Sequence, residues 1–182
     1  AKIAQAIPLV IQEISLRAYE VPVHKQTKGS YECAPTCLSM LLAYYHEKDT
    51  RYPNLTPQEI IAKLGDAYSP TGIAADDLAA EINQMGLNLQ AECKTACNAD
   101  DIRTALQDGP IMANVHLGAD PSSKTDAHMI VVTGLSADGK TVHVNDPWTG
   151  QAEEWSWEKF ENKWTFSAYP GGLRVIVTIK TN

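Results

Sequence analysis

Apolar side chains recur at helical spacing through the first half of the chain. Over residues 34–47 they fall at Leu38, Leu41, Leu42 and Tyr45, which is the period of an α-helix with one buried face. Three further segments combine such spacing with polar boundaries, and we expect helices there as well. They are NLTPQEIIAKLG from residue 54, TGIAADDLAAEINQMG from residue 71 and NADDIRTALQDG from residue 98.

These three segments carry boundary signals. Thr56 can cap its helix, Pro57 fits the first turn and Glu59 completes a capping box. Gly65 then provides a residue suited to ending the helix, and Gly86 does the same for the next one. In the last predicted helix Asn98 is the cap and Gly109 the stop.

From residue 110 onward the pattern changes to short runs rich in β-branched residues, which predict strands. The runs are 110–117, 128–135, 141–146, 151–157 and 172–180. Asp138-Gly139, between the second and third runs, predicts a hairpin turn. Helices followed by antiparallel strands predict an α+β domain with two segregated layers.

The domain organisation that we expect is simple. We find neither an internal repeat nor a Gly-, Pro- or Ser-rich linker, so residues 1–182 are interpreted as a single domain. The apolar residues before residue 24 favour an extra strand on the sheet, and residues 1–20 are expected to form that strand or an arm.

Composition and charge narrow the class of protein. The chain is 44% hydrophobic and 20% charged, which is ordinary for a folded domain and unlike a disordered one. Its net charge of -7 argues against nucleic acid as the main partner. No apolar run is long enough for membrane insertion, and the first twenty residues do not resemble a signal peptide.

The four cysteines form two CxxxC pairs, Cys33/Cys37 and Cys93/Cys97. This number is too small for a disulfide scaffold at this length. Two pairs at helical spacing could still converge on one zinc ion, although four-thiolate sites usually have tighter CxxC spacing. A local Cys93–Cys97 disulfide is a further alternative.

Cys33 stands out because it opens a predicted helix, in GSYECAPTCLSMLLAYY. Pro35 fits the first turn, where unpaired N–H groups and the helix dipole favour an anion such as a thiolate. Cys37 lies one turn later and suits a buried apolar position. The alternative is that both cysteines only fill space in the core.

A thiolate nucleophile needs an imidazole base and a group that orients the imidazole. Of the five histidines, His128 opens a predicted strand directly after a polar loop, and Asp146 ends the neighbouring strand. A two-residue turn at Asp138-Gly139 would place Asn145, rather than Asp146, on the face of His128. Asp146 can meet His128 only if the hairpin contains a bulge or a longer turn, so Asp146 and Asn145 are both candidates for the orienting residue.

Three blocks of sequence together resemble the bacteriocin-leader-processing type of papain-fold cysteine peptidase. They are HKQTKGSYECAPTCLSMLLAYY, LQDGPIMANVHL and DAHMIVVTGLSADGKTVHVNDPW. The resemblance implies a papain-like fold with Cys33 as nucleophile, His128 as general base and acid, and Asp146 as its orienter. It also implies that Gln26 donates to the oxyanion, and Gln26 lies far enough before Cys33 that residues 27–31 must bulge.

The resemblance implies a cysteine peptidase that acts on a peptide or protein and needs no metal or organic cofactor. It favours a secreted protein, or part of a larger bacterial protein, over a nuclear or membrane one. Two alternatives remain: a deamidase, amidase or acyltransferase on the same fold, and a non-catalytic module that binds peptide or zinc.

Overall fold

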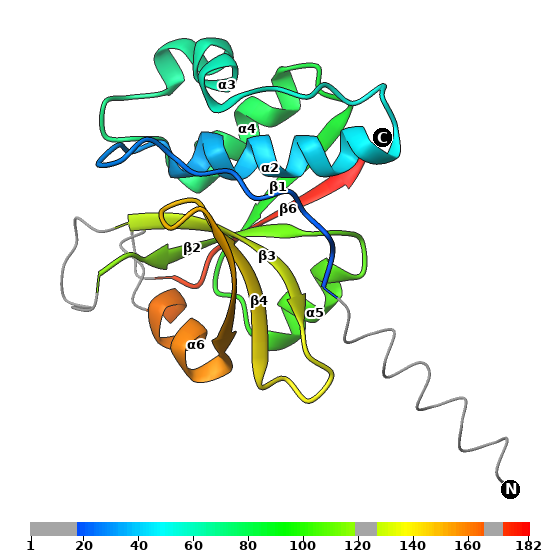
Figure 1. The fold of residues 1–182 in the computed structure, drawn as a ribbon, viewed down its shortest axis with the longest axis vertical. Coiled ribbons are helices and arrows are strands. Elements are labelled where there is room, and N and C mark those ends of the chain that lie inside the picture. The colour runs from blue at the N-terminus through cyan, green and yellow to red at the C-terminus, as the bar shows by residue number, and fades with distance from the viewer. Residues whose placement is uncertain (1–17, 119–126, 166–172) are drawn as a thin grey trace, which may run out of the picture.

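A computed structural model describes residues 18–118, 127–165 and 173–182. Its centre is a six-stranded sheet in the order β1-β6-β2-β3-β4-β5, in which the neighbouring strands pair antiparallel (Figure 1). The strands are β1 (Leu89–Lys94), β2 (Ile111–His116), β3 (Ala127–Leu135), β4 (Thr141–Asp146), β5 (Gln151–Ser156) and β6 (Ile176–Thr181).

Three helices cover one face of this sheet: α2 (Cys33–Lys48), α3 (Pro57–Leu64) and α4 (Ala75–Gln84) (Figure 1). A short 3-10 turn, Gly65–Ala67, follows α3. The core between these helices and the sheet contains Leu38 and Leu41 from α2 and Met129 and Val131 from β3, all buried. This packing fixes α2, and therefore the cysteine at its start, against the middle of the sheet.

The opposite face of the sheet is also covered, by α5 (Ala99–Leu106) and α6 (Trp157–Thr165). Ile102, Phe160 and Trp164 pack there against sheet residues such as Ile130 and Val132. The expectation of two segregated layers is therefore incomplete, because the sheet needs cover for two apolar faces and not for one.

The predicted helix boundaries agree with the observed caps. Thr56 accepts a hydrogen bond from the Glu59 backbone while the Glu59 side chain returns one to Thr56, and Asn98 and Asp101 form the same reciprocal box. Each box satisfies two of the N–H groups that a helix start leaves unpaired.

Two elements were not predicted, β1 and α6. In β1 the less exposed residues Leu89, Ala91 and Cys93 alternate with exposed polar residues, which is the pattern of a strand. α6 begins where Ser156 accepts the Lys159 N–H, and Phe160 and Trp164 follow at helical spacing. Both signals are short, and α6 follows β5 without a turn residue between them.

The N-terminal segment is described only from Ala18. Residues 18–24 form no strand of the sheet, but the Tyr19 N–H donates to the Thr133 carbonyl of β3 at 2.9 Å. The rest of the predicted strand or arm lies outside the described residues, and the single-domain assignment of 1–182 stays a prediction. No helix in the described ranges is long and apolar enough to cross a membrane.

Candidate active site

Cys33 is the first residue of α2, and its side chain is half-buried. The first turn carries no acidic residue, and Glu32, at the N-cap, makes no side-chain cap bond. The start of α2 therefore keeps its favourable environment for an anion.

Cys37, one turn into α2, has a different environment. It is fully buried, its sulfur donates to the Met129 carbonyl at 3.3 Å, and burial raises the pKa of its thiol well above the ordinary value. A protonated, buried thiol is a packing group, which leaves Cys33 as the accessible thiol of the pair.

His128 is buried near the start of β3 and has partners on two sides. Its Nε2 lies 2.7 Å from Asp146 Oδ1, and the ring lines the same cleft as Cys33, whose thiol is close enough to raise the pKa of the ring. Because Nε2 is engaged by the carboxylate, Nδ1 is the ring nitrogen left for Cys33. The imidazole thus connects the start of α2 to the end of β4.

Burial has the largest influence on the pKa of His128 and lowers it, but the hydrogen bonds with Asp146 and Cys33 and the charges of both groups outweigh it. The pKa of His128 is raised to about 9. Burial tends to raise the pKa of Asp146, yet the bond and charge of His128, with the Trp148 N–H at 2.9 Å, hold it below its usual value. The raised pKa of His128 and the lowered pKa of Asp146 both favour a protonated imidazole beside an ionised carboxylate.

A bulge in β3 determines that Asp146, and not Asn145, meets His128. From the turn, Gly134 pairs with His143, but the register then shifts, and Val131 pairs with Asn145. Because side chains alternate across a strand, this one-residue shift turns Asp146 to the face of His128. The Asn145 amide lies on the other face and donates to the Val21 carbonyl at 2.9 Å. The alternative orienter is therefore not in contact with the imidazole.

Gln26 is buried beside Cys33 and lines the same cleft. Its Nε2 donates to the Ser30 carbonyl at 2.8 Å, while its Oε1 is buried without a hydrogen-bond partner. The residues between Gln26 and Cys33 make the expected bulge, a turn in which the Ser30 N–H donates to Thr27 at 3.0 Å and Gly29 adopts φ 73°.

These side chains meet in a cleft of about 180 Å³. Two exposed aromatic residues stand at its rim, Tyr31 at 51% and Trp148 at 41% exposure. The Trp148 ring meets His128 edge-on at 6.5 Å between centroids, and Tyr68 donates to the Tyr31 carbonyl at 3.1 Å from the segment after α3. The cleft thus has an apolar rim around a polar floor, which suits an extended chain with a reactive carbonyl.

Of the aromatic rim, only Trp148 has a sequence signal, its position two residues after Asp146. Trp155 and Trp164 are buried in the core below the sheet. Tyr31 and Tyr68 gave no sequence signal, because their roles depend on how the segment after α3 folds back.

Of the remaining four histidines, His116 at the end of β2 lines a neighbouring pocket together with His128 and Asp146, and the other three lie elsewhere. His46, in the last turn of α2, bonds the Tyr52 carbonyl, His143 lies 3.6 Å from Glu154, and His24 bonds Ser39. None of these three lines the cleft beside Cys33.

The second cysteine pair forms no disulfide, and it is not helical. Cys93 lies on β1 and packs against the core under α2, whereas Cys97 is buried in the core on the other face of the sheet. Within the described ranges no three His, Cys, Asp or Glu side chains are grouped to hold a metal ion. The two pairs therefore do not form the four-thiolate cluster that was considered.

Comparison with known proteins gives a family match over most of the chain. The model of the Peptidase_C39 like family matches residues 18–169, a range that contains every residue of the candidate site. No curated protein matches the sequence.

Solved structures with a similar fold include three peptidases or peptidase-like domains. A double glycine motif protease from an AMS/PCAT transporter, solved with its leader peptide, is 20% identical with a TM-score of 0.62, over 91% of this chain and 94% of that one. Xylellain, a cysteine protease from Xylella fastidiosa, is 11% identical with a TM-score of 0.59, over 90% and 84%.

The third is the N-terminal peptidase C39 like domain of a toxin secretion ATP-binding protein from Vibrio parahaemolyticus. It is 12% identical with a TM-score of 0.52, over 86% of this chain and all of that one. At these identities the likeness concerns the fold, which is the papain-like α+β fold expected from the sequence.

Proposed function

The chain belongs to the Peptidase_C39-like family and is a papain-like cysteine peptidase, and from that premise we propose that Cys33, His128 and Asp146 carry out the hydrolysis. The observation that carries this proposal is the position of His128, a buried ring with Cys33 on one side and Asp146 on the other. In this mechanism Cys33 is the nucleophile, His128 the general acid and base, and Asp146 the group that orients the ring.

The reaction proceeds in two steps. The Cys33 thiolate attacks the carbonyl carbon of a peptide bond, the C–N bond breaks, and His128 gives its proton to the leaving amine. The N-terminal part of the substrate is then a thioester on Cys33. His128, now neutral, takes a proton from water, the resulting hydroxide attacks the thioester, and the carboxylic acid leaves while the thiolate and imidazolium are restored.

Each attack places negative charge on the carbonyl oxygen, and donors near Cys33 can stabilise it. The Gln26 amide nitrogen carries two hydrogens, of which one is given to the Ser30 carbonyl. The second, together with the Cys33 backbone N–H at the start of α2, is available to the oxyanion. Gln26 lies in the floor of the same cleft, which supports this role.

The substrate that we propose is a peptide or an extended segment of a protein. Two exposed aromatic side chains, Tyr31 and Trp148, line the cleft beside Cys33 and can pack against the main chain of a bound peptide. The leader peptide bound to the AMS/PCAT transporter protease supports a peptide ligand for this fold.

Peptide-library profiling with a matched pair of variants tests the proposal. The parent protein and a Cys93→Ala control, changed on β1 away from the cleft, should cut the same peptides at the same bonds. Cys33→Ala should cut none of them while keeping the parent's thermal unfolding midpoint. Cutting by Cys33→Ala at the parent rate contradicts the mechanism, and products that gain one mass unit without chain cleavage identify a deamidase instead.

A further inference from the structure

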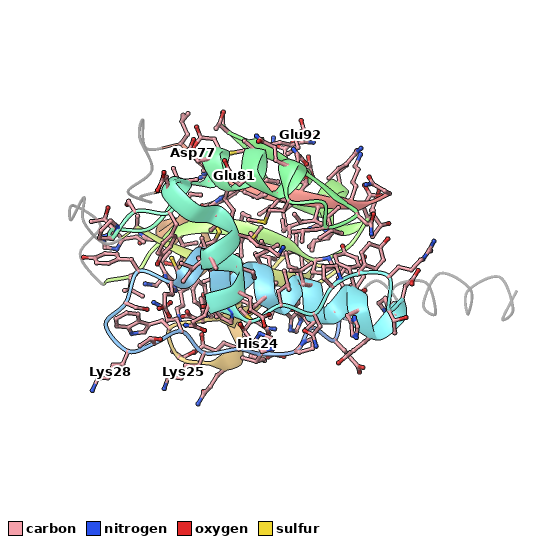
Figure 2. All side chains as sticks on the ribbon, turned by 90° about the horizontal axis from the view of Figure 1, so that it is seen from above. His24, Lys25, Lys28, Asp77, Glu81 and Glu92 are labelled. Atoms are coloured by element: carbon pink, nitrogen blue, oxygen red, sulfur yellow. The ribbon has the colours of Figure 1, made fainter. Side chains whose placement is uncertain are left out.

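Residues 18–26, called the strap here, carry Gln26 to the cleft without belonging to a helix or a strand. The strap is bonded to α2 through one side chain, and to β3 and β4 through single hydrogen bonds to its backbone. Figure 2 shows Lys25 and Lys28 projecting outward on the strap side of the molecule, opposite Asp77, Glu81 and Glu92. Because the strap has no regular pattern of backbone hydrogen bonds, the position of Gln26 depends on a few individual contacts, which are described next.

The strap is held on its α2 side by His24. His24 Nδ1 lies 2.8 Å from Ser39 Oγ, and Ser39 gives its own hydrogen to the Thr36 carbonyl at 2.6 Å. Since the Ser39 hydrogen is already donated, the imidazole must be the donor to Ser39. Burial lowers the pKa of His24, which favours the neutral ring.

On its sheet side the strap is held by Asn145. This residue is 2% exposed, and its Nδ2 donates to the Val21 carbonyl at 2.9 Å, a bond between two buried groups more than a hundred positions apart in the sequence. A buried carbonyl that loses its donor is costly, so this bond constrains where the strap can run.

Consecutive residues at the end of β4 hold different parts of the site. Asp146 holds His128, and the Pro147 carbonyl accepts the Gln26 N–H at 2.9 Å. Alternation along the strand turns Asn145 to the face of the strap while Asp146 faces the imidazole. We infer that Asn145 is a positioning residue for Gln26, so that the end of β4 aligns the imidazole and the oxyanion donor together. The role of Gln26 as an oxyanion donor rests on the proposed function, whereas the anchoring of the strap by Asn145 does not.

Amide hydrogen exchange tests the anchoring without any substrate. Replacing Asn145 by Ala, or by Leu to keep the volume, should make the Gln26 and Val21 amides exchange about tenfold faster, since local opening becomes easier. The Trp148 amide, held by Asp146, should keep its protection. If either variant fails to fold, the other decides; unchanged protection at Gln26 in a folded variant overturns the inference.

Kinetics on the peptide cut fastest in the library tests the catalytic consequence. Asn145→Ala should lower kcat roughly tenfold with little change in KM, because a displaced donor weakens only the transition state. The same change in a Gln26→Ala background should have no further effect on kcat. Equal losses in both backgrounds would mean that Asn145 acts by another route, which overturns the inference.

Two further measurements separate positioning from general damage. Iodoacetamide alkylation of Cys33 forms no oxyanion, so its rate should be the same in Asn145→Ala as in the parent. Asn83→Ala is the matched control: it removes an amide side chain bonded to the Ala91 backbone, far from the cleft, and should leave kcat unchanged. A slower alkylation in Asn145→Ala would count against a role confined to Gln26.

The two proposals fail in different ways. A parent protein that cuts no peptide contradicts the proposed function, and with it the catalytic role of Gln26, whatever the exchange result. Normal cleavage by the parent with unchanged Gln26 exchange in the Asn145 variants contradicts only this inference.

Discussion

The His128 imidazole is a buried ring whose charge is determined by its two neighbours. Burial alone favours the neutral ring, yet Asp146 and Cys33 together raise its pKa to about 9. Because folding raises this pKa above the 6.5 of an exposed imidazole, the protonated ring stabilises the fold. That contribution is fully present below about pH 6.5 and is lost as the pH rises through about 9.

The first prediction follows from this protonation. In the parent protein kcat/KM should fall as the pH rises through about 9, because the imidazolium that protonates the leaving amine is lost. Asp146→Asn removes one of the groups that raise the pKa of His128, so the alkaline limb should move down by about one pH unit or more. Initial rates between pH 5 and pH 10 locate the alkaline limb in the parent and in the variant. An alkaline limb at the same pH in both proteins would contradict the influence of Asp146 on the pKa of His128.

A second prediction concerns the four thiols. At neutral pH iodoacetamide should modify Cys33 far faster than the other three, since Cys33 lines the cleft beside a protonated ring. Burial raises the pKa of Cys37 well above its usual value and that of Cys97 to about 11, which slows both. Peptide mapping after brief labelling gives the order, with urea-unfolded protein as the control in which all four react. Equal labelling of the four thiols in the folded protein would contradict the assignment.

At the scale of elements, the register of the β3–β4 hairpin determines which side chain, Asp146 or Asn145, reaches His128. Sequence predicted both strands and the turn between them, but a turn register alone puts Asn145 on the face of His128. The bulge near Thr133 reverses this, and the strap contacts the bulge, because the Thr133 carbonyl accepts the Tyr19 N–H. A contact between segments so far apart leaves no local pattern.

The third prediction tests this junction. A Cβ on Gly134 would lie 2.9 Å from the Ala18 Cα and 3.1 Å from its Cβ, so Gly134→Ala must displace the strap or the bulge. We expect a loss of about 1–3 kcal/mol in the free energy of unfolding, as for other overpacked sites. Denaturant titration gives this loss, and hydrogen exchange should report weaker protection of the Tyr19 amide.

Gly65→Ala provides the comparison for that variant. Nothing lies within 4 Å of a Cβ there, and the only cost is its positive φ of 54°. It should leave the Tyr19 amide protected. Equal deprotection of Tyr19 in both variants would contradict a direct contact between the strap and the bulge.

At the scale of the whole molecule, the site forms where the helical layer meets the sheet (Figure 1). The thiol comes from the start of α2, the imidazole from β3, and the carboxylate from β4. Periodicity predicted most helices and strands because each is a local signal. His128 was selected by its place at the start of a predicted strand after a polar loop, and the resemblance of three motifs supported its pairing with Cys33.

The rest of the site depended on tertiary contacts that sequence does not carry. The cover of the second sheet face by α6, the contact of Tyr68 with Tyr31 and the anchoring of the strap by Asn145 are examples. Each follows from how segments pack once the sheet has formed.

Trapping the acyl intermediate is the most direct test of the central claim, that peptide cleavage proceeds through a thioester on Cys33. Hydroxylamine added to the reaction with a cleaved peptide competes with water for this thioester. The account predicts a hydroxamate of the N-terminal product that increases with hydroxylamine, with no product of either kind from Cys33→Ala. Cleavage that yields only the free acid at every hydroxylamine concentration, and that persists in Cys33→Ala, would contradict it.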